Sequence, residues 1–236
     1  MTTSDLNPRP PLKSISSMAT RQLLAELARV NEASGGALLA LESVGGVDAA
    51  RRVHAGESFD LVFLASDAIA KLITAGDVIK DSRVDLVCSQ VAVAIKAGAA
   101  ASSIATEADV RQAVLDAASI GYSTGPSGTA LLALFERWGI MTEMQSKLRQ
   151  APAGVPVAAM VASGDVALGF QQRSEMIDAP GIQVIGDLPA EIAIVTVFSG
   201  GVCRASTRSD QARALLSAFA APNHAAIKLQ YGMAAF

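Results

Sequence analysis

The stretch LVFLASDAIAKLITAG, residues 61–76, decides the fold. Its first five residues form an uninterrupted apolar run, which is the pattern of a strand buried on both faces of a parallel sheet. Ser66 and Asp67 then supply a helix cap, and Gly76 ends a helix over residues 68–75. This order of strand, tight turn and helix predicts one βα unit of an α/β protein.

The same alternation continues on both sides of this unit. Upstream, residues 12–17 and 37–43 are predicted strands, and each is followed by a predicted helix, the second of which runs over 47–55 and stops at Gly56. Downstream, the apolar pattern predicts helices over 107–117, 129–138 and 155–163 and strands over 119–122 and 166–171. The sequence therefore predicts a largely parallel sheet with helices on its faces.

The chain is expected to divide into two lobes. Residues 86–95 form an apolar run, interrupted at Cys88-Ser89-Gln90, that is long enough to leave one sheet and enter another. Residues 192–198 form another apolar strand, and the predicted helices 211–220 and 225–231 have no sheet of their own to cover. We therefore predict a discontinuous first lobe, residues 12–88 with 193–236, and a second lobe, residues 89–192.

Composition restricts the partners of the chain. Its 236 residues carry a formal net charge of −3, no cluster of Lys and Arg, and only 4% aromatic residues, which argues against nucleic acid as a partner. Apolar residues make up 51% and charged residues 17%, so the chain can bury a well-packed core. No stretch reaches the roughly 18 to 20 uninterrupted apolar residues of a membrane span, so we expect a protein that is not embedded in a membrane.

The N-terminus and the cysteines bear on location. The first residues, MTTSDLNPRPPLKS, lack the apolar core of a secretory signal, which indicates a cytoplasmic protein as written and a periplasmic one if a leader has been removed. Cys88 and Cys203 are too few for a zinc site or a disulfide framework. We expect two buried thiols, and a single bridge between them is left open.

Four turns hold the residues expected to bind a ligand. They are Ser16-Ser17-Met18-Ala19-Thr20, Gly45-Gly46-Val47-Asp48, Ser123-Thr124-Gly125-Pro126-Ser127-Gly128-Thr129 and Gly154-Val155-Pro156. In parallel sheets, ligands bind where strands end and helix N-termini point unpaired N–H groups outward. Such N-termini favour a small anion without many cationic side chains. Taken singly, each turn is equally explained by ordinary capping of a helix.

Other kinds of site are not indicated. No phosphate-binding Lys-Ser or Lys-Thr pair closes the glycine-rich turn, and no G-x-G-x-x-G motif follows the first strand. There is no G-x-S-x-G motif, and the only histidines, His54 and His224, have no nearby partner in the sequence. We expect no cofactor and no metal.

The order of these segments resembles a known family. The resemblance is carried by Ser16–Ala19, Ala50–Gly56, Phe59–Asp67, Val161–Phe170 and Tyr231-Gly232. Over residues 14–236 the chain resembles the molybdate-binding family of type II periplasmic solute-binding proteins. The resemblance implies an α/β fold of two lobes, each a parallel or mixed sheet flanked by helices, with a ligand cleft between them. It also implies an ABC permease as a partner.

The resemblance also implies a set of binding residues. By position, the turns that hold the oxyanion in the family correspond here to Ser17, Met18, Ala19, Gly46, Val47, Ser127, Pro156 and Gln172, flanked by Gly45 and Gly128. Pro156 has no N–H to donate, and Gln172 stands where the family has a tyrosine. The remaining neutral donors, Ser16, Ser17, Ser123, Thr124 and Ser127, suit a carboxylate that Arg21 or Arg173 could clamp. We therefore expect a small organic di- or tricarboxylate, with molybdate as the alternative.

Three functions fit this expectation. The first is a solute-binding protein that closes around its ligand and presents the closed form to a permease. The second is an isomerase of unsaturated polycarboxylic acids, because the chain is also similar to an aconitate-isomerizing offshoot of this fold. Asp48, Tyr122 and Glu42 are candidates for the base of such a reaction. The third is a ligand sensor that reports to a partner protein.

Overall fold

The computed structural model describes residues 10–152 and 154–236, and it confirms the alternation of strands and helices. The first part of the chain forms one group of elements. These are β1 (Leu12–Ser17), η1 (Met18–Thr20), α1 (Arg21–Ala33), β2 (Leu39–Val44), α2 (Gly46–His54), β3 (Leu61–Ala65), α3 (Ser66–Ala75) and η2 (Lys80–Ser82). The strand β3, predicted from its apolar run, is buried at every residue.

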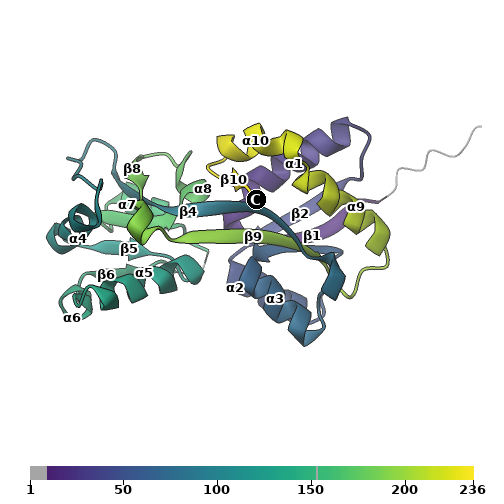
Figure 1. The fold of residues 1–236 in the computed structure, drawn as a ribbon, viewed down its shortest axis with the longest axis horizontal. Coiled ribbons are helices and arrows are strands. Elements are labelled where there is room, and N and C mark those ends of the chain that lie inside the picture. Colours follow the sequence, from purple (N-terminus) through teal and green to yellow (C-terminus); the bar gives the residue numbers. More distant parts are fainter. Residues whose placement is uncertain (1–9, 153) are drawn as a thin grey trace, which may run out of the picture.

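The middle of the chain forms a second group of elements, on the left in Figure 1. These are α4 (Glu107–Asp116), β5 (Ile120–Tyr122), α5 (Pro126–Arg137), α6 (Met141–Met144), β6 (Leu148–Gln150), α7 (Val157–Ser163), β7 (Leu168–Gln172), α8 (Arg173–Met176), β8 (Ile182–Asp187) and η3 (Ala190–Ile192).

Two long strands connect the groups. The first half of β4 (Val84–Lys96) pairs with β9 (Val195–Val202), and its second half, from Val91 onward, pairs with β7 and β8. Figure 1 shows β4 and β9 running side by side across the middle of the molecule. The apolar run thus pairs with strands of both groups, and its role as the crossing between two lobes stays a prediction.

The end of the chain returns to the first group. After β9 come α9 (Ser209–Ala220), η4 (Pro222–His224), α10 (Ala225–Gln230) and β10 (Ala234–Ala235). Phe219 of α9 stacks on Phe63 of β3 with ring centroids 6.2 Å apart, and both belong to one core that includes the leucines of α1. The terminal helices thus cover the first sheet, as expected from their lack of a sheet of their own.

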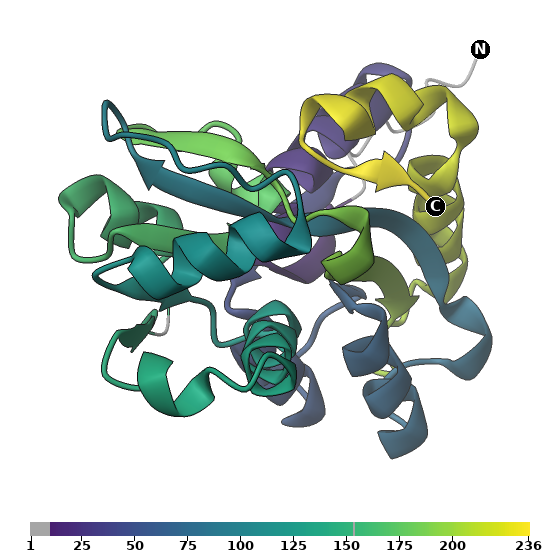
Figure 2. The ribbon, with the colours of Figure 1, turned by 60° about the vertical axis from the view of Figure 1, so that its left-hand side comes forward.

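The strand order is β2-β1-β3-β9-β4-β7-β5-β6, with β8 and β10 also paired to β4. The strands β2, β1 and β3 are parallel, as are β7, β5 and β6, whereas the β9 and β4 pairings are antiparallel. Each group packs apolar helices on both faces of its part of the sheet, which gives four buried clusters. Figure 2 shows these layers from a second direction.

Several element boundaries differ from the predictions. Ser66 is the first residue of α3 and caps nothing, since the helix begins after Ala65, and no side chain caps it. The helix α5 begins at Pro126, three residues earlier than predicted, because proline suits the first position of a helix. The short elements β6, β8 and α6 were not predicted. The lobe boundaries predicted at residues 88/89 and 192/193 remain a proposal.

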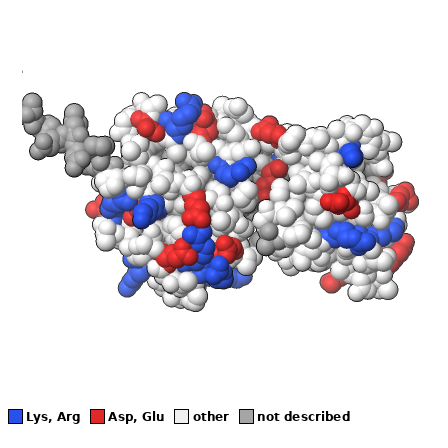
Figure 3. Space-filling model, turned by 180° about the vertical axis from the view of Figure 1, so that it is seen from behind, with Lys and Arg blue, Asp and Glu red and all other residues white. Residues whose placement is uncertain are grey.

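None of the helices in the described parts of the chain is long and apolar enough to cross a bilayer. On the face drawn in Figure 3, acidic and basic side chains are intermixed, and neither sign gathers into a broad patch.

Cys88 and Cys203 are free thiols in this structure, and Cys203 is buried whereas Cys88 is half-buried.

A carboxylate holds the returning chain against the first strand. Asp60, at the start of β3, accepts hydrogen bonds from the Lys13 N–H at 2.9 Å, from the Ser206 hydroxyl at 2.7 Å and from the Arg208 guanidinium. Arg208 also donates to the carbonyl groups of Pro10 and Pro11. Burial by itself would raise the pKa of Asp60, but these hydrogen bonds together lower it below its usual value. Asp60 therefore joins the beginning of the lobe to its end.

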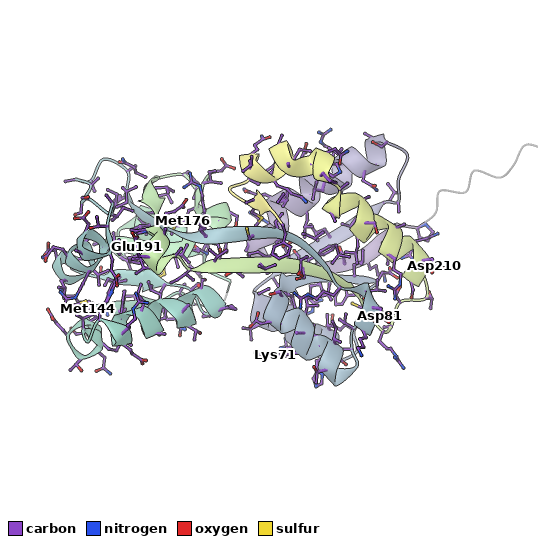
Figure 4. The ribbon with its side chains drawn as sticks, viewed as in Figure 1. Lys71, Asp81, Met144, Met176, Glu191 and Asp210 are labelled. Atoms are coloured by element: carbon purple, nitrogen blue, oxygen red, sulfur yellow. The ribbon has the colours of Figure 1, made fainter. Side chains whose placement is uncertain are left out.

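We expect Asp60→Asn to destabilise the protein by about 2–3 kcal/mol at pH 7, because Arg208 loses its charged partner. A lowered pKa stabilises the fold above the usual titration range of aspartate, and this contribution disappears as the pH falls through the lowered pKa. Urea unfolding at pH 7 and pH 3 measures both effects. The control is Asp81→Asn, at an exposed aspartate labelled in Figure 4. An equal loss of stability in both variants would contradict the role of Asp60.

Candidate functional site

A cleft of about 530 Å³ lies between the two groups of elements. The first group lines it with residues from η1, α2, β3 and α3, and the second with the β5–α5 turn, the segment before α7, and the end of β7 with α8. Thr196 and Phe198 of the connecting strand β9 also line it. The volume falls within the range of roughly 300–1,000 Å³ that is common for small-molecule sites.

The buried part of the cleft carries hydroxyl groups. Ser17 is the last residue of β1 and is only 7% exposed, and its hydroxyl has no hydrogen-bond partner among the described residues. Ser127, also buried, shares a hydrogen bond of 3.0 Å with Ser123. Beside Ser17, the first turn of α2 begins at Gly46, where the main-chain N–H groups have no partner within the helix. These groups can donate to a bound anion.

Two glutamines at the end of β7 also line the cleft. The Nε2 of Gln172 donates to the Thr196 hydroxyl at 2.7 Å, and its Oε1 is buried with no partner in residues 10–152 and 154–236. Gln171 accepts a hydrogen bond from the main-chain N–H of Ala158 at 3.2 Å and donates to Glu175 at 2.8 Å. The N–H of Ala158, in the first turn of α7, is therefore already occupied.

Glu175 is a carboxyl group in the wall of the cleft. Burial raises its pKa to about 7, whereas the hydrogen bond from Gln171 and the charge of Arg21 act in the opposite direction. No ion pair to Glu175 is present among residues 10–152 and 154–236. Glu175 also lines a second cavity of about 410 Å³, together with Arg21 and Asp178.

Two cationic side chains and a histidine lie at the exposed rim of the cleft. Arg51 and His54 come from α2 and Lys71 from α3, and all three are exposed. Figure 4 labels Lys71 on the helix that borders the space between the two groups. Arg51 pairs with Asp48, and the Nδ1 of His54 lies 2.7 Å from a carboxylate oxygen of Asp77. The hydroxyl-bearing residues Ser17 and Ser127 are thus buried, whereas Arg51 and Lys71 face solvent.

Most of the predicted binding residues meet in this cleft. Those that line it are Ser17, Met18, Ala19, Gly45, Gly46, Val47, Ser123, Thr124, Ser127, Pro156 and Gln172. The remaining four do not: Ser16, Arg21, Gly128 and Arg173. The side chain of Ser16 bonds Ser43 on β2 at 2.8 Å, because successive residues of a strand point to opposite faces.

The other three have identifiable positions. Arg21 lines the second cavity, and Arg173 pairs with Asp187 at 3.0 Å. Gly128 lies beneath the Ser123 carbonyl, where a Cβ atom would come within 1.9 Å of the oxygen. Its role is to let the β5–α5 turn close, which holds Ser123 and Ser127 in place.

None of the three residues predicted as a possible base lines the cleft. Asp48 pairs with Arg51 on the surface of α2, and Glu42 pairs with Arg52. Tyr122 packs against the core of the second group. Sequence reasoning instead missed Glu175, Arg51 and Lys71, which line the cleft from helices. The only sequence signal for Glu175 is its spacing of four from Gln171, and nothing in that spacing shows that it lines a cleft.

Nothing indicates a metal centre, since the described residues include no group of three or more His, Cys, Asp or Glu side chains placed to hold an ion.

The family of the chain follows from comparison with known proteins. Residues 12–234 match the family described as bacterial extracellular solute-binding protein. The chain belongs to this family. Among curated proteins, it is 38% identical over 175 residues to an aconitate isomerase of Pseudomonas sp, an alignment that covers 74% of this chain. That alignment spans 66% of the relative's length, a little under two thirds.

Solved structures confirm the predicted type II fold with two lobes and a cleft between them. The periplasmic molybdate-binding protein of Azotobacter vinelandii superposes with a TM-score of 0.76 at 20% identity, covering 94% of this chain and 98% of that one. A tungstate ABC transporter structure from Geobacter sulfurreducens gives 0.73 at 16% identity, with the same coverage. At such low identity these likenesses establish the fold and not the ligand.

The pKa of Glu175 predicts a pH-dependent stability. Burial disfavours the ionised form and raises the pKa from 4.5 to about 7, so the protein is most stable while Glu175 is protonated, and this stability is lost as the pH rises from 4.5 through 7. Between pH 5 and pH 8 the ligand-free wild type should therefore lose up to about 3 kcal/mol relative to Glu175→Gln. Urea unfolding of both proteins at the two pH values measures the difference. Glu191→Gln, at an exposed residue, is the control and should follow the wild type. Parallel behaviour of all three proteins would contradict the burial of this carboxyl.

Proposed function

We propose that the chain binds a small organic di- or tricarboxylate in the cleft, as the solute-binding component of a transport system. The observation that carries the proposal is the unpartnered hydroxyl of Ser17, which is buried beside the N-terminus of α2. A buried hydroxyl without a partner costs about 1–3 kcal/mol of stability. A bound carboxylate would accept its hydrogen bond together with those of nearby main-chain N–H groups.

The spacing of donors and cations favours a ligand with several carboxylates. One carboxylate would be held by neutral donors at the buried end, among them Ser17 and Ser127. A second would lie near the rim, within reach of Arg51 and Lys71. A compact oxyanion would use only one end of a cleft of about 530 Å³. A longer polycarboxylate would use both ends.

The wall opposite α2 gives an oxyanion few main-chain donors. Pro156, which precedes α7, has no N–H, and the N–H of Ala158 is bonded to Gln171. Gln172 could compensate by a half-turn of its amide. The Thr196 hydroxyl would then donate to Oε1, and Nε2 would donate into the cleft.

Exposed apolar side chains on both walls support closure around the ligand. Val47 on α2 is 68% exposed and Val155 before α7 is 41% exposed, and both line the cleft. Hinge closure about the paired strands β4 and β9 would bring the walls together and remove apolar surface from water. The closed form would then be the state that a membrane permease recognises, in the periplasm if the chain is exported.

A second candidate function is isomerisation of an unsaturated polycarboxylate. It is favoured by the 38% identity to a protein named aconitate isomerase, and by a carboxyl group, that of Glu175, in the wall of the cleft. Binding is common to both functions, and only the second requires turnover.

A ligand screen tests the binding proposal. Isothermal titration calorimetry with citrate, cis-aconitate, trans-aconitate, molybdate and sulfate should give saturable binding for at least one tricarboxylate. The same ligand should stabilise the folded state, by about 2.7 kcal/mol at a concentration one hundred times its Kd. Binding of molybdate or sulfate without binding of any carboxylate would contradict the proposal.

Substitution of Ser17 separates binding from folding. We expect Ser17→Ala to weaken binding of the stabilising tricarboxylate by about 10- to 100-fold, because a hydrogen bond to a charged group is lost. The ligand-free variant should be as stable as the wild type or slightly more so, since an unsatisfied hydroxyl is removed. Ser89→Ala is the control, because Ser89 is also buried without a partner and lines neither cavity. Equal affinities of the two variants would contradict a contact from Ser17.

A further inference from the structure

Glu175 lies between two cavities. It lines the ligand cleft and also the second cavity, which is bordered by Arg21 and Asp178. Met18 and Pro156 also border both cavities, so the two spaces adjoin along this wall. A carboxyl group in this position can face a ligand on one side and exchange a proton with solvent on the other.

The orientation of the Glu175 carboxyl is set by one side chain. The main-chain N–H of Ala158 can only donate, so the atom of Gln171 that it contacts must be the amide oxygen. The Nε2 of Gln171 is therefore the atom that faces Glu175, and it donates to Oε1 at 2.8 Å. No hydrogen bond to the second oxygen occurs within the described part of the chain, which leaves Oε2 able to accept or hold a proton.

This arrangement differs from that of the structural carboxylates of the same protein. Asp60 is held by three donors, one of them an arginine, and Asp187 by Arg173. Glu175 has a single neutral donor and no ion pair among the described residues, although Arg21 acts on it from a distance. Placing a half-buried carboxyl group among so few partners costs stability, which is typical of a group kept for proton transfer.

We propose that Glu175 moves the proton in an allylic rearrangement of an unsaturated polycarboxylate held in the cleft, an inference that rests on the proposed function. The carboxylate would take a proton from the methylene carbon beside the double bond. The C–H electron pair would form a new double bond, and the old π pair would become a carbanion at the former vinylic carbon. Glu175 would return a proton to that carbon. One C–H bond breaks and one forms, so no co-reactant is needed.

The surrounding groups suit this step. The carbanion is delocalised into the carboxylates of the ligand, where Ser17 and the N-terminus of α2 can stabilise the growing charge. The pKa of about 7 places the group where it both accepts and donates a proton near neutral pH. The charged and titratable groups that border the two cavities with Glu175 are Arg21, Arg51, His54, Asp67, Lys71 and Asp178.

The test uses cis-aconitate and trans-aconitate with the full chain. Calorimetry measures binding, and proton NMR follows interconversion of the two isomers. We expect the wild type to bind and interconvert them. Glu175→Gln should bind with a Kd within about threefold of the wild type while kcat falls by about 100-fold or more, because only the proton transfer is removed. Retained binding also shows that the variant is folded.

The pH dependence of kcat/KM and a control variant distinguish a catalytic role of Glu175 from a purely structural one. The kcat/KM of the wild type should rise with pH through about 7 as Glu175 ionises, and the residual activity of Glu175→Gln should lack this rise. Glu191→Gln, at an exposed glutamate labelled in Figure 4, should keep the wild-type rate.

The outcomes separate this inference from the binding proposal. Binding of aconitate without interconversion by the wild type would overturn the inference and leave the binding proposal standing. Interconversion that survives Glu175→Gln within tenfold would also overturn the inference. Failure of every tricarboxylate to bind the wild type would instead remove the proposed function on which the inference rests.

Discussion

The pairing of β4 with β9 is the constraint on which the rest of the structure depends. The strand β4 belongs to both halves of the molecule, since it pairs with β9 over its first half and with β7 and β8 over its second, while β9 joins β4 to β3. The ladder fixes the direction in which each half presents its strand ends. The ends of β1, β3, β5 and β7 therefore open toward one cleft, although they come from distant parts of the sequence. The closure proposed for the ligand-bound state would use these two connecting strands as its hinge.

The distribution of charge in the cleft follows from this geometry. Charged residues make up 17% of the chain, so few cationic side chains are available to contact a ligand. The buried wall offers hydroxyl groups and the N-terminus of α2, which can hold negative charge without the desolvation cost of a buried arginine or lysine. Arg51 and Lys71 stay at the rim, where water still solvates them. An anion would thus be attracted by charged groups and held by neutral ones.

The order of elements was predictable because local patterns dictate it. The apolar run of β3 and the glycine after α3 define their elements without tertiary information, and Gly76 indeed adopts a left-handed conformation with φ of 83°. The strand β6 was missed because its three residues give no periodicity. The strand β8 was missed because it is half-exposed and carries a weak apolar signal. Turns that follow strands were also predictable as cleft residues, since topology brings strand ends together.

The chemistry of individual side chains was less predictable. Adjacent residues of a strand end point to opposite faces, so Ser17 lies in the cleft while Ser16 bonds Ser43. Glu175 and Lys71 lie on helices and line the cleft because of the way the two halves are placed. No local sequence pattern contains that placement. The candidate site is distinguished in the folded protein by polar atoms that lack hydrogen-bond partners among the described residues. Ser17, Gln172 and Glu175 each keep an oxygen without a partner in the described structure or open to a cavity, whereas Asp60 is fully engaged. A fold that leaves these groups unsatisfied gives up stability at the place where a ligand can restore it.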